Sequence, residues 1–193
     1  MDGGQTAPAL AGAVGLFERA IGYTRSSLGY VTHTAMGRPT PCTDWNLGAL
    51  LCHMDDALIA LQEAADIGYV DLQPRTDDPT VDIVTALRAR ACALLGAWAG
   101  KVGDGQVSVA GSPVPAGVLA STGALEVAVH GWDVARACGR EWQLPPRLAE
   151  DLLELAPLLV SDDDRPVRFA PPVDVRPLAP PGERLLAFLG RQS

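Results

Sequence analysis

Lysine is almost absent from this sequence: Lys101 is the only one, and arginine supplies the other basic side chains. With 15 lysines and arginines against 23 aspartates and glutamates, the chain carries a formal net charge of −8 at pH 7. Nucleic acids and anionic membrane surfaces attract proteins with basic patches. We therefore expect neither a nucleic acid nor a membrane as the main partner.

The sequence also lacks the signals of export and of membrane insertion. No basic segment precedes an apolar one near the N-terminus, as a secretory signal peptide would require. No stretch of 18 apolar residues is without ionisable groups. The four cysteines are far apart and form no C-x-x-C pair. We therefore expect a cytoplasmic protein whose cysteines are reduced and packed rather than bridged or bound to zinc.

Several common functional motifs are missing. There is no G-x-S-x-G elbow, so a serine hydrolase has no support. The glycines of segment 100–105 follow no expected strand and are not a dinucleotide-binding fingerprint. Three consecutive aspartates, 162–164, lack the 12-residue pattern of a calcium loop and predict a solvated turn.

What the sequence does have is helical periodicity. Apolar residues recur at the spacing of one helix face in four long segments, about 9–28, 47–68, 80–100 and 116–138. Short connections make a mainly α fold, an antiparallel four-helix bundle, the expected architecture. We expect Thr43 or Asp44 to cap the second helix and Asp78 or Thr80 to cap the third, and Gly139 to end the fourth.

Two further regions complete the expected fold. QVSVA and the residues around Val114, joined by Gly-Ser-Pro, predict a small hairpin between the third and fourth helices. After the bundle come a helix over 146–160, an acidic loop over 161–165, an extended segment over 167–175 and a short helix over 182–190. We expect residues 1–140 to form a metal-binding bundle and 141–193 to pack on it, in one domain overall.

Glu126 and His130 stand four residues apart in the most apolar long run of the chain. Residues at this spacing lie on one face of a helix. A carboxylate and an imidazole buried together need a partner, and a metal ion would serve both. His53, in the second amphipathic segment, is a third candidate ligand. Three protein ligands with one open position are typical of a catalytic zinc site.

The same residues permit a simpler interpretation, in which Glu126 and His130 form a structural hydrogen-bonded pair and His53 is partly exposed. Asp133 could orient a ligand histidine or could pair with Arg136, and the sequence favours neither. His33 is expected in a solvated loop. Core packing is the better explanation for Cys52, and core or helix-end packing for the four tryptophans, Trp45, Trp98, Trp132 and Trp142.

Two segments resemble the signatures of a known family. PTPCTDWNLGALLCHM (39–54) resembles P-T-P-C-x-x-W-x-x-x-x-L-x-x-H, and EVAVHGWDVARACG (126–139) resembles E-x-x-x-H-x-W-D-x-A-x-A-x-G. Both are signatures of the DinB-like, mycothiol-dependent maleylpyruvate isomerase superfamily. The tail, RFAPPVDV and APPGERLLAFLGR, is similar to that of the family's short metal-binding branch.

The resemblance implies a DinB-like four-helix bundle with a divalent metal, most often zinc, held by His53, Glu126 and His130. It also implies mycothiol, a low-molecular-weight thiol, as a cofactor or a transferred group. A metal-bound sulfur has a lowered pKa and forms a thiolate at neutral pH. The implied activity is that of a thiol-dependent transferase or isomerase acting on a small electrophile. The chain departs from the longer maleylpyruvate isomerases, whose C-terminal domain helps to bind the thiol.

Two other functions stay open from the sequence. One is a thiol-independent hydrolase or lyase that uses the same metal ligands. The other is a non-catalytic bundle that binds a small molecule in an apolar cavity. In each case we expect a monomer or a homodimer.

Overall fold

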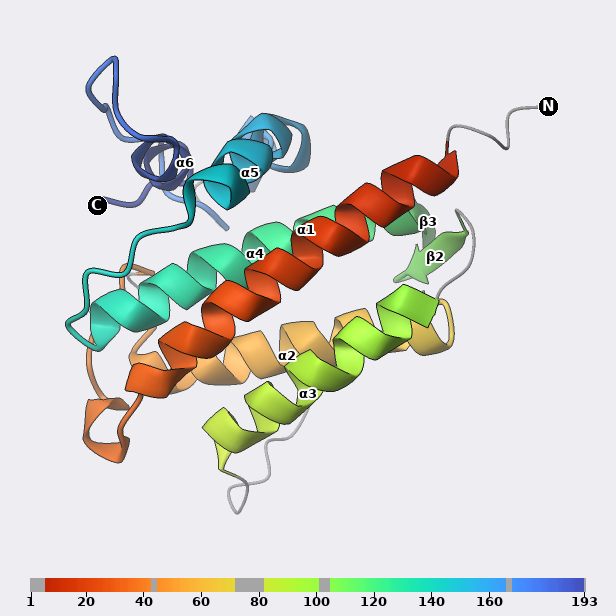
Figure 1. Cartoon of the computed structure of the whole chain (residues 1–193), viewed down its shortest axis with the longest axis horizontal. Coiled ribbons are helices and arrows are strands. Elements are labelled where there is room, and N and C mark those ends of the chain that lie inside the picture. The colour runs from red at the N-terminus through yellow and green to blue at the C-terminus, as the bar shows by residue number, and fades with distance from the viewer. Residues whose placement is uncertain (1–5, 43–44, 72–81, 101–104, 166–167, 193) are drawn as a thin grey trace.

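The computed structural model describes residues 6–42, 45–71, 82–100, 105–165 and 168–192. It is a mainly helical, DinB-like bundle, as expected (Figure 1). Its four long helices are α1 (Thr6–Ser27), α2 (Leu47–Asp66), α3 (Ile83–Gly100) and α4 (Ala116–Ala137). Apolar side chains from all four form one continuous core.

Helix α4 is buried on almost every side, because it lies against both α1 and α2. Two of its glycines allow close approach to these neighbours. A Cβ at Gly131 would overlap Thr24 of α1, and a Cβ at Gly123 would lie 2.8 Å from Leu61 of α2 and 3.3 Å from the ring of Phe17 of α1. The Thr24 hydroxyl also donates to the carbonyl of Val127 over 2.7 Å. These contacts set how closely α4 packs against α1 and α2.

The ends of the helices follow local capping rules. The predicted cap of α2 is wrong: Asn46 is the N-cap, and its side chain accepts from the backbone N–H of Ala49 over 2.9 Å. Both residues predicted for that role, Thr43 and Asp44, lie outside the described residues. Gly139 follows α4 with φ +73°, a conformation that glycine adopts without strain, and thus ends the helix as expected.

The start of α3 was also predicted one turn too early. The carboxylate of Asp82 accepts from the backbone N–H of Val84 over 3.3 Å and from the hydroxyl of Thr85 over 2.6 Å. Asp82 therefore stabilises the first turn of α3. The predicted caps, Asp78 and Thr80, lie outside the described residues.

The expected hairpin is present, with a different turn. Strands β2 (Gln106–Val109) and β3 (Ser112–Pro115) pair antiparallel and are joined by Ala110 and Gly111, not by Gly-Ser-Pro. Both turn residues have positive φ, 47° and 84°, as a two-residue turn that matches the strand twist requires. A two-residue strand, β1 (Tyr69–Val70), pairs parallel to β2; it is too short to leave a pattern in the sequence.

The C-terminal part lies against one side of the bundle. Helix α5 (Pro146–Leu159) contacts α1 and α4, and α6 (Pro181–Phe188) packs on α5 (Figure 1). The predicted acidic loop is a short 3-10 helix, η3 (Asp162–Asp164), within the bend that follows α5. Of the predicted extended segment, 168–175 has no regular pairing, although Val173 donates to the carbonyl of Ala187 over 2.9 Å; 166–167 lie outside the described residues.

Two further 3-10 helices, η1 (Leu28–Tyr30) and η2 (His33–Ala35), follow α1. Among the described residues, one helix, α3, is long and apolar enough to cross a membrane by length and composition. It carries Arg88 and Arg90, and its buried residues, such as Trp98, belong to the bundle core. This is weak support for a membrane span.

Candidate metal centre

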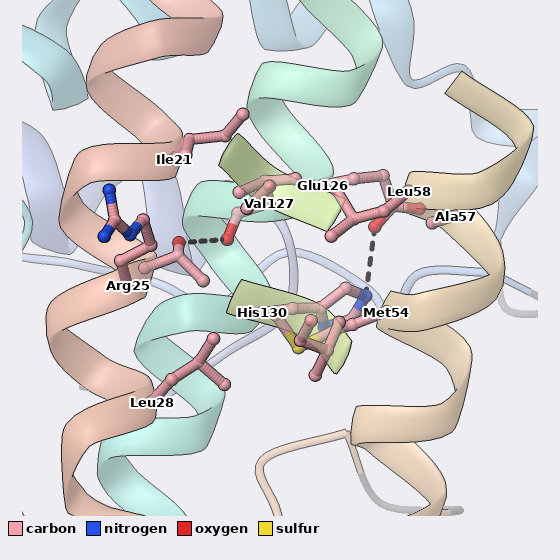
Figure 2. Close-up of a pocket in the computed structure, with 12 residues that line it drawn as sticks. Ile21, Arg25, Leu28, Met54, Ala57, Leu58, Glu126, Val127 and His130 are labelled. Atoms are coloured by element: carbon pink, nitrogen blue, oxygen red, sulfur yellow. Dashed lines mark hydrogen bonds and ion pairs between the residues drawn. The ribbon is translucent and has the colours of Figure 1, made fainter. Parts of the chain in front are cut away.

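A pocket lies between the four long helices; its own space is about 20 Å³, and about 390 Å³ when the adjoining open solvent is counted. Most of the lining is apolar. The lining side chains are Ile21, Thr24, Arg25, Leu28, Met54, Ala57, Leu58, Leu87, Ala91, Glu126, Val127 and His130. Figure 2 shows Glu126 and His130 on α4, beside Leu58 and Met54 of α2. The two predicted ligands on α4 therefore lie in the wall of this pocket.

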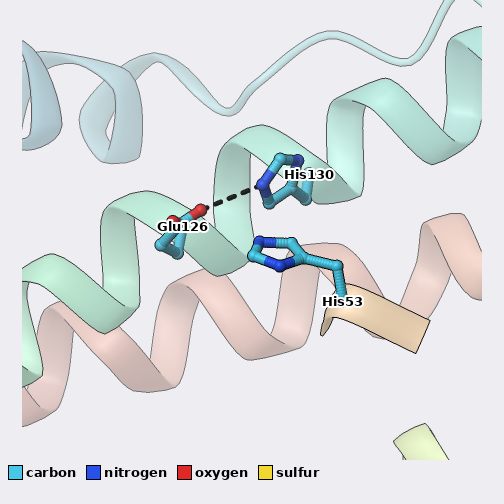
Figure 3. Close-up of side chains that lie close together, drawn as sticks. All are labelled: His53, Glu126 and His130. Atoms are coloured by element: carbon cyan, nitrogen blue, oxygen red, sulfur yellow. Dashed lines mark ion pairs between the residues drawn. The ribbon is translucent and has the colours of Figure 1, made fainter. Parts of the chain in front are cut away.

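The structure brings the three sequence-predicted ligands together. Each of His53, Glu126 and His130 offers a ligand atom, and these atoms all lie within 4.8 Å of one another (Figure 3). Helix α2 supplies His53, while the other two lie one turn apart on α4. Nε2 of His130 is 3.0 Å from Oε2 of Glu126, and the Glu126 side chain is 37% exposed. Two imidazoles and one carboxylate with an accessible side fit the donor set of a catalytic zinc site.

Asp133 lies behind His130 and settles the alternative that the sequence left open. Its Oδ2 is 3.0 Å from Nδ1 of His130, on the ring edge away from Glu126. Asp133 therefore holds the imidazole with its proton on Nδ1, which leaves Nε2 for a ligand. Arg136 does not pair with Asp133; its guanidinium stands over the ring of Trp132, 5.6 Å from the centroid.

The partner of Asp133 is Arg191, a residue that the sequence analysis missed. Nε of Arg191 is 3.0 Å from Oδ1 of Asp133, and Nη2 is 2.8 Å from Oδ2. Gly190, with φ +79°, turns the chain after α6, and the N–H of Arg191 bonds back to the carbonyl of Leu186 over 2.8 Å. In the sequence, Arg191 is the last residue of the tail segment APPGERLLAFLGR that resembles the family. Its pairing with Asp133 depends on tertiary contacts that the sequence does not show.

Trp45 forms a wall of the cluster. It precedes α2, as helix-end packing predicts, but its ring also lies 4.4 Å from that of His53 and 6.1 Å from that of His130, centroid to centroid. Its place in the P-T-P-C-x-x-W signature was the signal for this contact. Trp98 is buried in the core, as expected.

The charges of the cluster shift its proton equilibria. Burial works to lower the pKa of His130, but hydrogen bonds to Asp133 and Glu126 and their charges raise it to about 9. Burial and the neighbouring charge of His130 lower the pKa of His53, more than Glu126 and Asp56 raise it. Without a metal, therefore, His130 holds the proton at neutral pH and His53 is neutral.

The pKa values of the two carboxylates in the cluster, Glu126 and Asp133, are lowered. Burial works to raise the pKa of Glu126, yet the hydrogen bond and charge of His130, with His53 and Arg191, lower it overall. Burial also opposes ionisation of Asp133, but His130 and Arg191 lower its pKa. Both carboxylates are thus ionised at neutral pH, which gives the site two negative charges near two imidazoles.

The remaining histidine plays no part in this cluster. His33 lies exposed in η2, as the sequence predicts for a solvated residue. Cys52, next to His53 in sequence, is half-buried and is not one of the three clustered ligands.

Residues 17–135 match the family described as the mycothiol maleylpyruvate isomerase N-terminal domain. The chain belongs to this family. The matched region contains all three clustered ligands, whereas Arg191 lies beyond it. The family carries a mycothiol-related, isomerase-like function.

Two uncharacterized proteins of Mycobacterium tuberculosis, from strains CDC 1551 / Oshkosh and H37Rv, are similar over nearly the full length. Each is 29% identical over 180 residues, which cover 90% of this chain and 94% of the relative. No solved structure gives a significant match. The sequence match therefore supports family membership, and the arrangement of the three ligands is known from the structure of this chain alone.

Proposed function

We propose that this protein is a divalent-metal-dependent enzyme that uses a low-molecular-weight thiol, such as mycothiol, to isomerise or conjugate a small electrophile. The observation that supports it most directly is the gathering of two histidines and one glutamate beside an apolar pocket. The family match extends over the same residues. Zinc is the ion that this nitrogen and oxygen donor set suits best.

His53, Glu126 and His130 would hold the ion, which when bound would supply a Lewis acid that lowers the pKa of a thiol. Asp133 would keep His130 in the tautomer that presents Nε2. Trp45 would limit the rotation of His53 by packing against its ring. The apolar lining would exclude water and favour the uncharged part of the electrophile.

Both activities begin with the same bond. The thiol loses its proton, and its sulfur forms a C–S bond with an electrophilic carbon while the π bond of an activated alkene or the C–O bond of an epoxide breaks. In a transferase, the resulting carbanion or alkoxide takes up a proton, and the thioether is the product. In an isomerase, the sulfur adds to an activated double bond, the new single bond rotates, and elimination of the thiolate restores the double bond. The pocket wall near Glu126 is where this carbon would have to lie.

Metal content tests the first part of the proposal. Elemental analysis of protein purified without chelator should give about one zinc or other divalent ion per chain, lost in His53→Ala and Glu126→Ala. His33→Ala is the matched control, because His33 is exposed and outside the cluster. A chain without metal even after incubation with zinc, or equal loading in all variants, would refute the metal site.

Thiol dependence needs a separate assay. Metal-loaded protein should consume an activated alkene or an epoxide only when mycothiol is present, with cysteine as a comparison thiol. The Glu126→Ala variant should lose this activity. Full metal loading without reaction with any thiol tested, but with hydrolysis of the same electrophiles, would instead favour a thiol-independent metal enzyme.

One observation favours a second candidate, a binding bundle without catalysis. Glu126 and His130 already pair at 3.0 Å, and Asp133 satisfies the other ring nitrogen of His130. Such a network is stable without an ion. If no metal binds, Glu126→Gln should leave small-molecule binding in the pocket intact.

A further inference from the structure

A second pocket lies between the C-terminal half of α2 and the middle of α3, two helices that run side by side (Figure 1). Its own space is about 270 Å³, against about 20 Å³ for the pocket between the four long helices. The lining side chains are Ile59, Gln62, Glu63, Asp66, Ile67, Arg90 and Ala93. None of them belongs to the candidate metal centre. This α2–α3 pocket therefore has room for a small organic molecule that leaves the metal ligands in place.

Two carboxylates reach the α2–α3 pocket from one face of α2. Glu63 and Asp66 are three residues apart, so they project from the same side of the helix. Glu63 is half-buried and Asp66 is exposed. Gln62 donates to Oδ2 of Asp66 over 2.8 Å, which orients that carboxylate. The pocket therefore has an acidic side on α2.

Among the described residues that line the pocket, Arg90 is the basic one, and it is engaged by another acid. Its Nε is 2.7 Å from Oδ1 of Asp55, whose side chain is 15% exposed. One guanidinium and three carboxylates, counting Asp55, give these described side chains a net charge of −2. The pocket is thus acidic even with Arg90 included.

The placement of the two carboxylates is unfavourable for α2 by itself. Asp66 is the last residue of the helix and Glu63 lies in its last turn, where the backbone carbonyls carry partial negative charge. Helix α2 has no basic residue in that turn. A cation in the pocket would offset the charge of the carboxylates and of the helix end together.

The remaining lining is apolar. Ile59 and Ala93 contribute to the wall, and Ile67 is 70% exposed, which is unusual for a large aliphatic side chain. An apolar ligand body over Ile67 would remove this surface from water. Ca²⁺ and Mg²⁺ are held by about six oxygen ligands and gain nothing from an apolar wall. The lining therefore suits an organic cation better than a metal ion.

We propose that the α2–α3 pocket binds a small organic cation, a protonated amine with a short alkyl body. The ammonium group would lie beside Glu63 and Asp66 and donate to their carboxylates. The alkyl body would cover Ile59, Ile67 and Ala93. This site is separate from the candidate metal centre and does not depend on the proposed activity there.

Hexylammonium and hexanol test the proposal, because they have the same alkyl chain and differ in charge. Their dissociation constants can be measured by NMR titration of the full chain at neutral pH and low ionic strength. Hexylammonium should bind about five- to tenfold more tightly than hexanol. The shifted amides should lie in segments 59–67 and 90–93, and added salt should reduce the preference.

A double variant identifies the groups that bind the cation. Glu63→Gln with Asp66→Asn should remove the preference for hexylammonium and leave hexanol binding unchanged, which also shows that the pocket is intact. Asp56→Asn with Glu154→Gln is the matched control. It removes the same net charge from two exposed acids outside the pocket lining.

Three outcomes would overturn the proposal. One is equal binding of the two probes to the unmodified protein. Another is a preference that persists without the two pocket carboxylates or that the control variant loses equally, because net charge alone would then explain it. The third is a set of shifted amides centred on His53 and His130, which would place the cation at the candidate metal centre instead.

Discussion

Replacing Arg191 with alanine tests the support behind His130. The Asp133 side chain is 0% exposed and that of Arg191 is 7% exposed, so the pair is shielded from water. Arg191→Ala would leave the buried carboxylate of Asp133 without its guanidinium. Removal of one partner from a buried pair costs about 3–5 kcal/mol. Asp133 keeps its hydrogen bond to His130, which is protonated at neutral pH, so we expect the lower end, about 3 kcal/mol.

The loss can be measured by urea denaturation and by thermal unfolding of the metal-free protein. For a chain of this size, about 3 kcal/mol corresponds to a fall in Tm of roughly 6–12 °C. Arg176→Ala is the control, because Arg176 pairs with Glu183 while 79% of its side chain is exposed. An exposed pair contributes less than about 1 kcal/mol.

A double-mutant cycle separates the pair from general damage to the C-terminal segment. If the cost comes from the uncompensated carboxylate, Asp133→Asn combined with Arg191→Ala should cost clearly less than the two single changes added together. Asp133→Asn alone should weaken zinc binding by about 10- to 100-fold, because His130 loses its orientation. A loss in Arg191→Ala no larger than in Arg176→Ala would refute this reasoning.

The remaining predictions concern packing and pH. Gly131→Ala should destabilise the protein by about 1–3 kcal/mol in urea denaturation, because the new Cβ would overlap Thr24. The control, Gly22→Ala on the open face of α1, should stabilise the protein by up to about 1 kcal/mol. Equal effects of the two changes would contradict the close packing of α1 on α4. The pKa of His130 is raised to about 9 from its ordinary 6.5, so protonation of His130 stabilises the metal-free protein fully below about pH 6.5. This stabilisation is lost as the pH rises through 9. The Tm of the metal-free protein should therefore fall between pH 6.5 and 9. Zinc binds the neutral imidazole, so zinc binding should release the proton of His130. Calorimetry in buffers of different ionisation enthalpy should show this proton release, and the affinity for zinc should rise between pH 6.5 and 9. Zinc binding without proton release would exclude His130 as a ligand.

Much of the fold could be predicted from the sequence because it is local. The 3.6-residue periodicity identifies the four long helices, and the apolar run around Glu126 and His130 identifies the helix that the others bury. The hairpin also follows from short-range signals. The ends of the helices were predicted less well. Asn46, for example, caps α2 in place of Thr43 or Asp44, because several polar residues near a helix start can each accept a bond from the first backbone N–H groups.

The candidate site divides in the same way. Spacing alone places Glu126 and His130 on one helix face, since residues four apart stack in any α-helix. Whether His53 meets them depends on how α2 lies against α4, and only the tertiary structure decides this. The same holds for Arg191, which is 58 residues from Asp133 in sequence and reaches it through the turn at Gly190. Sequence determined the helices and their chemical groups, whereas packing over long sequence separations determined which groups came together.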